Sequence, residues 1–371
     1  MDDTFSIGRE EQIVSYDDAV RSGPARILFM GPRRSGKSSI ERVIFHKMSP
    51  HETLFLESTN NVEIQLIANN NFVRFQTWDF GGDMSLERDV MYMGKPISVE
   101  TIFKNCGTLI YVIDAQEEDY DHSLPLLVES IATAYSYNPS IHFEVFLHKV
   151  DGDVMSEDTK SERQTDIQHY VSSELSELHA SRDVLVSYYL TSIYDHSALE
   201  AFSRVVQKLV PQLPTLNRLL DILIASSCIS KSYLVDVVTK LYIATDSDPG
   251  DGATYELCSD LVDVVIDVSY IYGVNDNGVT VPYDKQSTSA TRLNSGMVLY
   301  LREVSSYLAL VCVMREEHFA KRALLDYNID CFRNSLADVF RETKPSVNGS
   351  SSSSNSSSSS SSSSGTTAPS T

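Results

Sequence analysis

The stretch ARILFMGPRRSGKSS (residues 25–39) decides the fold of the first half of the chain. Its first six residues form a short apolar run that is typical of a buried β-strand. Gly31 to Ser38 then fit the pattern G-x-x-x-x-G-K-[ST] in every position, and a polar helix start follows at Ser38. A loop of this kind, between a strand and a helix, closes backbone N–H groups around phosphates. The sequence therefore predicts a nucleoside-triphosphate site.

The residue types in this loop fit the chemistry of such a site. Lys37 can reach the β- and γ-phosphate oxygens, and the hydroxyl of Ser38 can bind Mg²⁺ at the start of the helix. The two loop arginines either contact phosphate or stay solvated, as loop arginines commonly do. The residues of this loop that we expect to contact the nucleotide are Arg33, Arg34, Ser35, Gly36, Lys37, Ser38 and Ser39.

Further apolar runs follow this strand and alternate with helical patterns. We predict strands over residues 72–78, 108–114, 143–147 and 186–190, with helices over 124–135 and 167–178 between them. This alternation is typical of a mainly parallel sheet with helices on both faces. Pro211 and Pro214 then interrupt the chain. We therefore expect a P-loop α/β domain over residues 25–213, after a disordered, acidic segment over residues 1–24.

A second α/β domain is predicted over residues 214–343. It contains a helix at 216–225, one or two strands within 233–245, an apolar stretch with helical breaks at 255–272, and strands at 297–303 and 306–314. An amphipathic helix closes it, with apolar residues near helical spacing from Leu325 to Phe340. Asp260, Asp263 and Asp267 fit a solvated helix face better than a metal site. Residues 344–371 are almost pure serine and should be disordered.

Two later motifs bear on which nucleotide is bound. Asp79 to Gly82 match D-x-x-G, in which Asp79 holds Mg²⁺ through water and the Gly82 amide can meet the γ-phosphate. The residues from His148 to Asp151 read H-K-V-D and resemble the N-K-x-D of guanine-binding proteins. Asp151 would accept two hydrogen bonds from the guanine ring edge, and it would reject adenine because buried polar groups would stay unpaired.

Other candidate residues lie around these motifs. Lys149 belongs to the second motif, and Ser192 and Ile193 follow the last predicted strand, where such proteins place a loop whose amide meets the guanine carbonyl. Thr53, in a predicted loop after Ser38, could give a second hydroxyl to Mg²⁺ when a γ-phosphate is present. The loop would then order in the triphosphate state and be released after hydrolysis. The alternative for Thr53 is an ordinary surface threonine.

The composition excludes several classes of partner. Lys and Arg number 30 against 51 Asp and Glu, which gives a net charge of −21. Such a charge repels phosphate backbones and anionic headgroups, so we expect neither nucleic-acid binding nor direct membrane insertion. Five scattered cysteines form no C-x-x-C pair and suit a reducing cytosol. We recognise no signal peptide or lipid anchor, and any membrane association should come through a partner.

The motifs together resemble the Rag family of GTPases. Similar segments run from GPRRSGKSS through HKMSPHETLFLEST, WDFGG, LIYVIDAQ, FEVFLHKVDG and YYLTSIYDHS to KLYIATDS, YELCSDLVDVVIDVS and LALVCVMREE. The histidine in HKVD is similar to the C/D subclass, called the Gtr-two type in fungi. The resemblance covers nearly the whole chain between the two tails.

This resemblance implies a GTPase that binds GTP or GDP with Mg²⁺ and switches conformation between the two states. It implies a heterodimer with an A/B-type GTPase through a roadblock-like or longin-like C-terminal domain. It further implies a lysosomal scaffold complex, the TOR kinase complex as the recipient of an amino-acid signal, and a GTPase-activating protein. The expected location is the cytoplasm and the cytosolic face of the lysosome or vacuole, with the nucleus as a further possibility.

The chain departs from the family in two places. Asp83 stands where the family usually has Gln, and a carboxylate there is repelled by the γ-phosphate and lacks an amide donor. Residues 84–105 are also longer than in family members. The catalytic candidates are thus Lys37 and Asp83, with slow hydrolysis expected. The alternative is a hydrolysis-deficient structural subunit; a P-loop kinase or ATPase fits less well, because of Asp151 and the lack of an arginine-rich lid.

Overall fold

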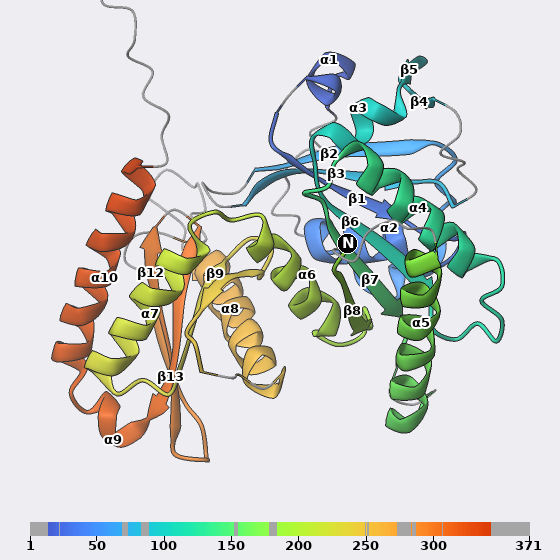
Figure 1. Cartoon of the computed structure of the whole chain (residues 1–371). Coiled ribbons are helices and arrows are strands. Elements are labelled where there is room, and N and C mark those ends of the chain that lie inside the picture. Colours follow the sequence, from blue (N-terminus) through green and yellow to red (C-terminus); the bar gives the residue numbers. More distant parts are fainter. Residues whose placement is uncertain are drawn as a thin grey trace, which may run out of the picture.

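A computed structural model describes residues 14–342, apart from residues 22, 69–72, 83–88, 152–154, 178–183, 249, 251, 273–282, 284–286 and 306. Two large sheets organise these residues and lie side by side, each with helices on its two faces (Figure 1). The first sheet has the strand order β2-β3-β1-β6-β7-β8, and the second has the order β10-β9-β13-β12-β11.

The first sheet is mainly parallel, as the sequence predicts. Its strands are β1 (Ala25–Met30), β2 (Val62–Ala68), β3 (Arg74–Phe80), β6 (Cys106–Asp114), β7 (His142–His148) and β8 (Val186–Thr191). Only β2, which the sequence analysis does not predict, pairs antiparallel, with β3. Because β1, β3, β6, β7 and β8 run in one direction, their carboxyl ends meet at one edge of the sheet.

Helices cover both faces of this sheet. The P-loop helix α2 (Lys37–His46) and α6 (Ser197–Lys208) pack on one face. The other face is covered by α3 (Val99–Lys104), α4 (Ser123–Tyr137) and α5 (Glu157–Glu177). A short 3-10 helix η1 (Glu52–Phe55) lies in the loop between α2 and β2.

The second sheet is antiparallel throughout. It consists of β9 (Lys231–Asp236), β10 (Tyr242–Thr245), β11 (Thr288–Arg292), β12 (Met297–Ser305) and β13 (Leu308–Arg315). One face packs against α7 (Leu213–Ser227), α9 (Glu316–Phe319) and α10 (Arg322–Glu342), and the other against α8 (Gly252–Tyr272). The expected breaks in 255–272 are wrong, because α8 is one helix that buries a stripe from Tyr255 to Ile266 at helical spacing.

The two sheets share a continuous apolar core. In Figure 1, α6 lies between them, and Phe202 on α6 belongs to the same cluster of buried side chains as Leu216 and Leu220 on α7. Ser203 on α6 accepts a hydrogen bond from the backbone N–H of Tyr242 at the start of β10, at 3.1 Å. Pro211 lies in the segment that joins α6 to α7. Pro214 lies in the first turn of α7, where proline is tolerated.

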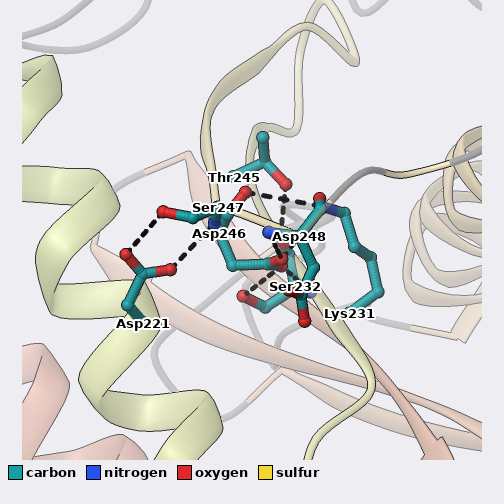
Figure 2. Close-up of polar contacts among 7 residues, drawn as sticks. All are labelled: Asp221, Lys231, Ser232, Thr245, Asp246, Ser247 and Asp248. Carbon is teal, nitrogen blue, oxygen red and sulfur yellow. Dashed lines mark hydrogen bonds and ion pairs between the residues drawn. The ribbon is translucent and has the colours of Figure 1, made fainter.

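A polar network secures the β10 edge of the second sheet (Figure 2). Lys231 and Asp246 form a buried ion pair at 2.9 Å, and the other carboxylate oxygen of Asp246 accepts the backbone N–H of Ser232 at 2.7 Å. Asp221 on α7 accepts both the N–H of Ser247, at 2.8 Å, and its hydroxyl, at 2.7 Å. The loop after β10 is therefore tied to β9 on one side and to α7 on the other.

The expectation that all of residues 1–24 are disordered is wrong for residues 14–21, which we call the N-terminal brace. Here α1 (Tyr16–Val20) forms with Ser15 as its N-cap. The buried Arg26 on β1 donates to the carbonyl of Ala19 at 2.6 Å and lies 4.8 Å from the ring centroid of Trp78. The sequence does not predict the brace, because two of its hydrogen bonds are made to Tyr92 and Pro96, which are distant in the sequence. Residues 1–13 and 343–371 lie outside the described residues.

The brace also holds a small hairpin that the sequence analysis did not predict, within the divergent segment 84–105. The hairpin consists of β4 (Val90–Tyr92) and β5 (Lys95–Ile97). The hydroxyl of Tyr92 donates to the carbonyl of Val14 at 2.6 Å, and that of Tyr16 donates to the carbonyl of Pro96 at 2.7 Å. Both strands of the hairpin are thus bound to the brace.

The acidic residues of α8 contact basic side chains outside the helix. No group of three or more His, Cys, Asp or Glu residues that could hold a metal occurs in the part of the chain that the structure describes. Asp263 instead pairs with Lys240 at 2.7 Å, and Asp260 lies 3.7 Å from His196. Among the described residues, no helix combines the length and the apolar character that a membrane crossing requires.

Candidate nucleotide site

A cavity of about 650 Å³ opens at the carboxyl edge of the first sheet. Its walls come from the loops after β1, β3, β6, β7 and β8, together with the loop between α2 and β2. The predicted site residues that line it are Arg33, Arg34, Gly36, Lys37, Ser38, Ser39, Thr53, Gly82, His148, Lys149, Asp151 and Ile193. Ser35 is buried within the loop. Asp79 accepts a hydrogen bond from the lining residue Ser38, and Ser192 donates one to the lining residue Asp151. Asp83 lies outside the described residues.

The phosphate loop has the backbone geometry that its glycines permit. Gly31 has a φ of +132°, and a Cβ on it would lie 2.2 Å from the carbonyl oxygen of Val112. Gly36, with a φ of +104°, precedes the first residue of α2. The ammonium of Lys37 donates to the carbonyls of Gly31 and Pro32, each at 2.9 Å. The loop therefore curls around this ammonium at the N-terminus of α2, where N–H groups favour an anion.

Three oxygen-bearing side chains meet beside this loop. The hydroxyl of Ser38 donates to Asp79, and the hydroxyl of Thr59 lies 3.1 Å from that of Ser38 and donates to the same carboxylate oxygen at 3.2 Å. Asp79 is fully buried, and its other oxygen, Oδ1, has no hydrogen bond among the described residues. Burial raises the pKa of Asp79. Oxygen ligands around an unsatisfied carboxylate are a donor set that fits Mg²⁺.

Thr59, and not the predicted Thr53, stands beside Ser38 and Asp79. Thr53 lines the cavity from η1, but its hydroxyl donates to the carbonyl of Pro50 at 2.7 Å. Thr59 precedes β2, and the register that pairs Glu63 with Asp79 brings the end of this loop to the carboxyl end of β3. Recognition of β2 as an antiparallel neighbour of β3 is the signal that could have identified Thr59.

The opposite end of the cavity carries the H-K-V-D motif. Asp151 accepts a hydrogen bond from the hydroxyl of Ser192, so the two sequence-predicted residues are in contact. Lys149, in the left-handed conformation at a φ of 65°, donates to the carbonyl of Arg34 at 2.7 Å and pairs with Asp114. This lysine therefore joins the base end of the cavity to the phosphate loop.

His148 is 1% exposed and lies against the phosphate loop. A Cβ on Gly36 would lie 2.4 Å from its Cδ2 atom, so only glycine allows this approach. Burial, with a smaller contribution from the nearby Lys149, lowers the pKa of His148 to about 4. The ring is therefore neutral near pH 7.

A buried carboxyl that the sequence patterns did not indicate lies on the P-loop helix, close to Asp79. Glu41 lies one turn into α2 and is fully buried. Burial, and to a smaller extent the charge of Asp79, raise the pKa of Glu41 to about 8. From sequence alone, an acidic residue in the first turns of a helix is expected to be solvated and to stabilise the helix dipole. The packing of α2 against the sheet instead buries Glu41.

A mainly parallel sheet whose first strand runs into a phosphate loop, followed by an antiparallel α/β domain, defines a P-loop GTPase fold with a C-terminal α/β domain. The comparison with protein families agrees, since the Gtr1/RagA G protein conserved region matches residues 26–262. The chain therefore belongs to the Rag/Gtr family of G proteins.

Relatives place the chain in the C/D subclass, as the resemblance predicts. It is 53% identical to Ras-related GTP-binding protein C of Homo sapiens over 319 residues, 86% of this chain and 77% of the relative. It is 44% identical to GTP-binding protein gtr2 of Schizosaccharomyces pombe over 320 residues, 85% of this chain and 98% of the relative. The identity to gtr1 of the same yeast is 24% over 233 residues, 62% and 70% of the two chains.

Proposed function

We propose that this chain is the C/D-type subunit of a Rag GTPase heterodimer that binds GTP or GDP in the cavity and reports its nucleotide state to partners. The observation that carries the proposal is the arrangement of one cavity, with a phosphate loop and an oxygen cluster at one end and the H-K-V-D motif at the other. Its volume of about 650 Å³ is in the range of small-molecule sites.

Guanine selection is assigned to Asp151. A carboxylate accepts hydrogen bonds only, and guanine offers two donors, its ring N1–H and its 2-amino group. Ser192 holds one oxygen of Asp151 in place. Adenine has no N1–H, so it would leave the carboxylate unpaired, and a buried unpaired group costs about 1–3 kcal/mol.

Ser38, Asp79 and Thr59 would hold Mg²⁺ beside the phosphates. When bound, Mg²⁺ neutralises charge on the β- and γ-phosphate oxygens. Lys37, now at carbonyls of the loop, would turn to the phosphates that the loop surrounds. Thr59 takes the role that the sequence analysis gave to Thr53, and its loop would be ordered in the GTP state and released with GDP.

Hydrolysis depends on residues beyond this cluster. Asp83 replaces the usual amide donor, so slow cleavage that needs an activating protein is proposed for this chain. The second candidate, a subunit that binds GTP but does not cleave it and serves as the structural half of the heterodimer, is favoured by the same substitution.

The roles proposed for the two domains follow from the family resemblance. Residues 25–213 would form the GTPase domain, and residues 214–343 a roadblock-like domain that binds the A/B-type partner. We further propose that a scaffold complex holds the heterodimer at the cytosolic face of the lysosome or vacuole, where it signals amino-acid sufficiency to the TOR kinase complex.

The nucleotide preference of an Asp151→Asn variant tests this function. An amide in place of the carboxylate can donate to the 2-oxo group of xanthine, so preference should move from GDP toward XDP. Competition of GDP, XDP and ADP against a fluorescent GDP on the full-length chain measures it. The exposed Asp158→Asn on α5 is the matched control. An Asp151→Asn variant that keeps the preference of the parent for GDP would contradict the assigned base site.

A further inference from the structure

The buried Arg26 on β1 connects the N-terminal brace to α3. One nitrogen of its guanidinium, Nη2, donates to the carbonyls of Ala19, at 2.6 Å, and Arg21, at 3.4 Å, where α1 ends. The other, Nη1, donates to the carbonyl of Thr101 and, at 3.4 Å, to that of Ile102, both on α3. Carbonyls in the last turn of a helix lack partners within the helix and carry the negative end of its dipole. One cation therefore bonds the ends of two helices.

The surroundings of Arg26 make this connection costly to break. Its side chain is 1% exposed, and its charge is met by backbone carbonyls and by the ring of Trp78. Within the described ranges, no carboxylate lies within ion-pair distance of it. A buried charge that loses its hydrogen-bond partners is strongly destabilising. Neither the brace nor α3 can move away without leaving this guanidinium underpaired, so their positions are coupled.

The hairpin of β4 and β5 joins the same unit. Besides the two tyrosine hydroxyl bonds to the brace, Nζ of Lys95 lies 4.8 Å from the ring centroid of Tyr16. Val14 of the brace, Ile97 of the hairpin and Ile102 of α3 belong to one cluster of buried apolar side chains. The hairpin and α3 therefore pack on the brace together, through hydrogen bonds and through a shared apolar core.

Residues 89–104, which comprise the hairpin and α3, follow the D-x-x-G motif, and in GTPases the segment after this motif commonly rearranges with the nucleotide state. We propose that the N-terminal brace and Arg26 hold residues 89–104 in one arrangement in both the GTP and the GDP state, and that displacement of the brace releases them. This inference rests on the proposed function of the cavity. None of the residues that line the cavity belongs to the brace or to residues 89–104.

Amide hydrogen exchange of the full-length chain with Mg²⁺, compared between GDP and a non-hydrolysable GTP analogue, tests this proposal. In the parent, exchange over residues 89–104 should be the same with both nucleotides, while the loop around Thr59 should exchange more slowly with the GTP analogue. Arg26→Lys keeps the charge but lacks the planar fork that reaches both helix ends. In this variant, exchange over residues 89–104 should become about tenfold faster, the value of one hydrogen bond to a charged group, and should differ between the nucleotides.

The matched control is Arg74→Lys, because Arg74 is an exposed arginine at the start of β3 in the same sheet. It should leave exchange over residues 89–104 as in the parent. A parent chain in which residues 89–104 respond to the nucleotide would overturn the proposal. So would an Arg26→Lys variant in which these residues exchange as they do in the parent.

If Arg26→Lys does not fold, the double variant Tyr16→Phe, Tyr92→Phe takes its place, since it removes the two hydroxyl bonds between the brace and the hairpin. Exchange over residues 89–104 should again become faster and depend on the nucleotide. Exchange that is as slow as in the parent and equal with both nucleotides would overturn the proposal.

The proposed function and this inference fail in distinguishable ways. A parent chain that binds no guanine nucleotide, or whose loop around Thr59 exchanges equally with GDP and the GTP analogue, contradicts the switching function of the cavity. The comparison of Arg26→Lys with the parent under one condition, without nucleotide, still decides whether the brace holds residues 89–104. A parent that binds both nucleotides and responds at the Thr59 loop and at residues 89–104 alike contradicts only the inference.

Discussion

Thr59 and Thr53 are two hydroxyls of one loop with different surroundings. Thr59 contacts Ser38 and Asp79, whereas Thr53 is bonded to the carbonyl of Pro50 within η1. Thr59→Ala should therefore weaken Mg²⁺-dependent GTP binding by about tenfold, since one oxygen ligand is lost. Thr53→Ala should have a smaller effect that is the same with and without Mg²⁺. GTP titrations of both variants, with Mg²⁺ and with a chelator, measure this. A reversed order would return the ligand role to Thr53.

Glu41 predicts a pH dependence of stability. Its pKa is about 8 when folded, against an ordinary value of 4.5. Between these values the folded chain keeps a proton on Glu41 that the unfolded chain releases, so the free energy of unfolding falls as pH rises through this window. Glu41→Gln should flatten this fall, while Glu129→Gln on the exposed face of α4 should not. Urea unfolding at several pH values between 5 and 8 measures it, and parallel curves for Glu41→Gln and the parent would contradict the buried carboxyl.

At the scale of elements, the N-terminal brace anchors the hairpin of β4 and β5 through two hydrogen bonds. The hydroxyls of Tyr16 and Tyr92 each bond a carbonyl across this contact. Tyr16→Phe and Tyr92→Phe should each lower the free energy of unfolding by about 1 kcal/mol. Amide hydrogen exchange over residues 89–97 should also become faster, because the hairpin loses an anchor. The exposed Tyr272→Phe is the control. Unchanged exchange in both variants would show that the brace does not hold the hairpin.

The elements also show what the sequence could and could not predict. The strands β1, β6 and β7 are continuous apolar runs buried on both faces, so their pattern identified them. The edge strand β2 and the hairpin are short or partly exposed, and their positions depend on partners far along the chain. The site divides in the same way: motif residues such as Lys37 and Asp151 were predictable, but Thr59 becomes relevant only through cross-strand register.

At the scale of the whole molecule, one apolar core extends from the P-loop helix to the second sheet. Ile40 on α2, Phe202 on α6 and Leu220 on α7 belong to the same buried cluster. Packed cores do not deform continuously, so a rearrangement of the loops around the nucleotide can be transmitted to the second domain through α6. This connection supports the proposal that partners of the second domain respond to the nucleotide state of the first.

Single-turnover GTP cleavage tests the central claim most directly. The sample is the purified heterodimer of this chain with the proposed A/B-type partner, in the presence of Mg²⁺, with the nucleotide site of the partner disabled by mutation. We predict slow cleavage of GTP that is lost in Lys37→Ala. Tight GTP binding without any cleavage would contradict the GTPase and favour the structural, non-hydrolysing subunit.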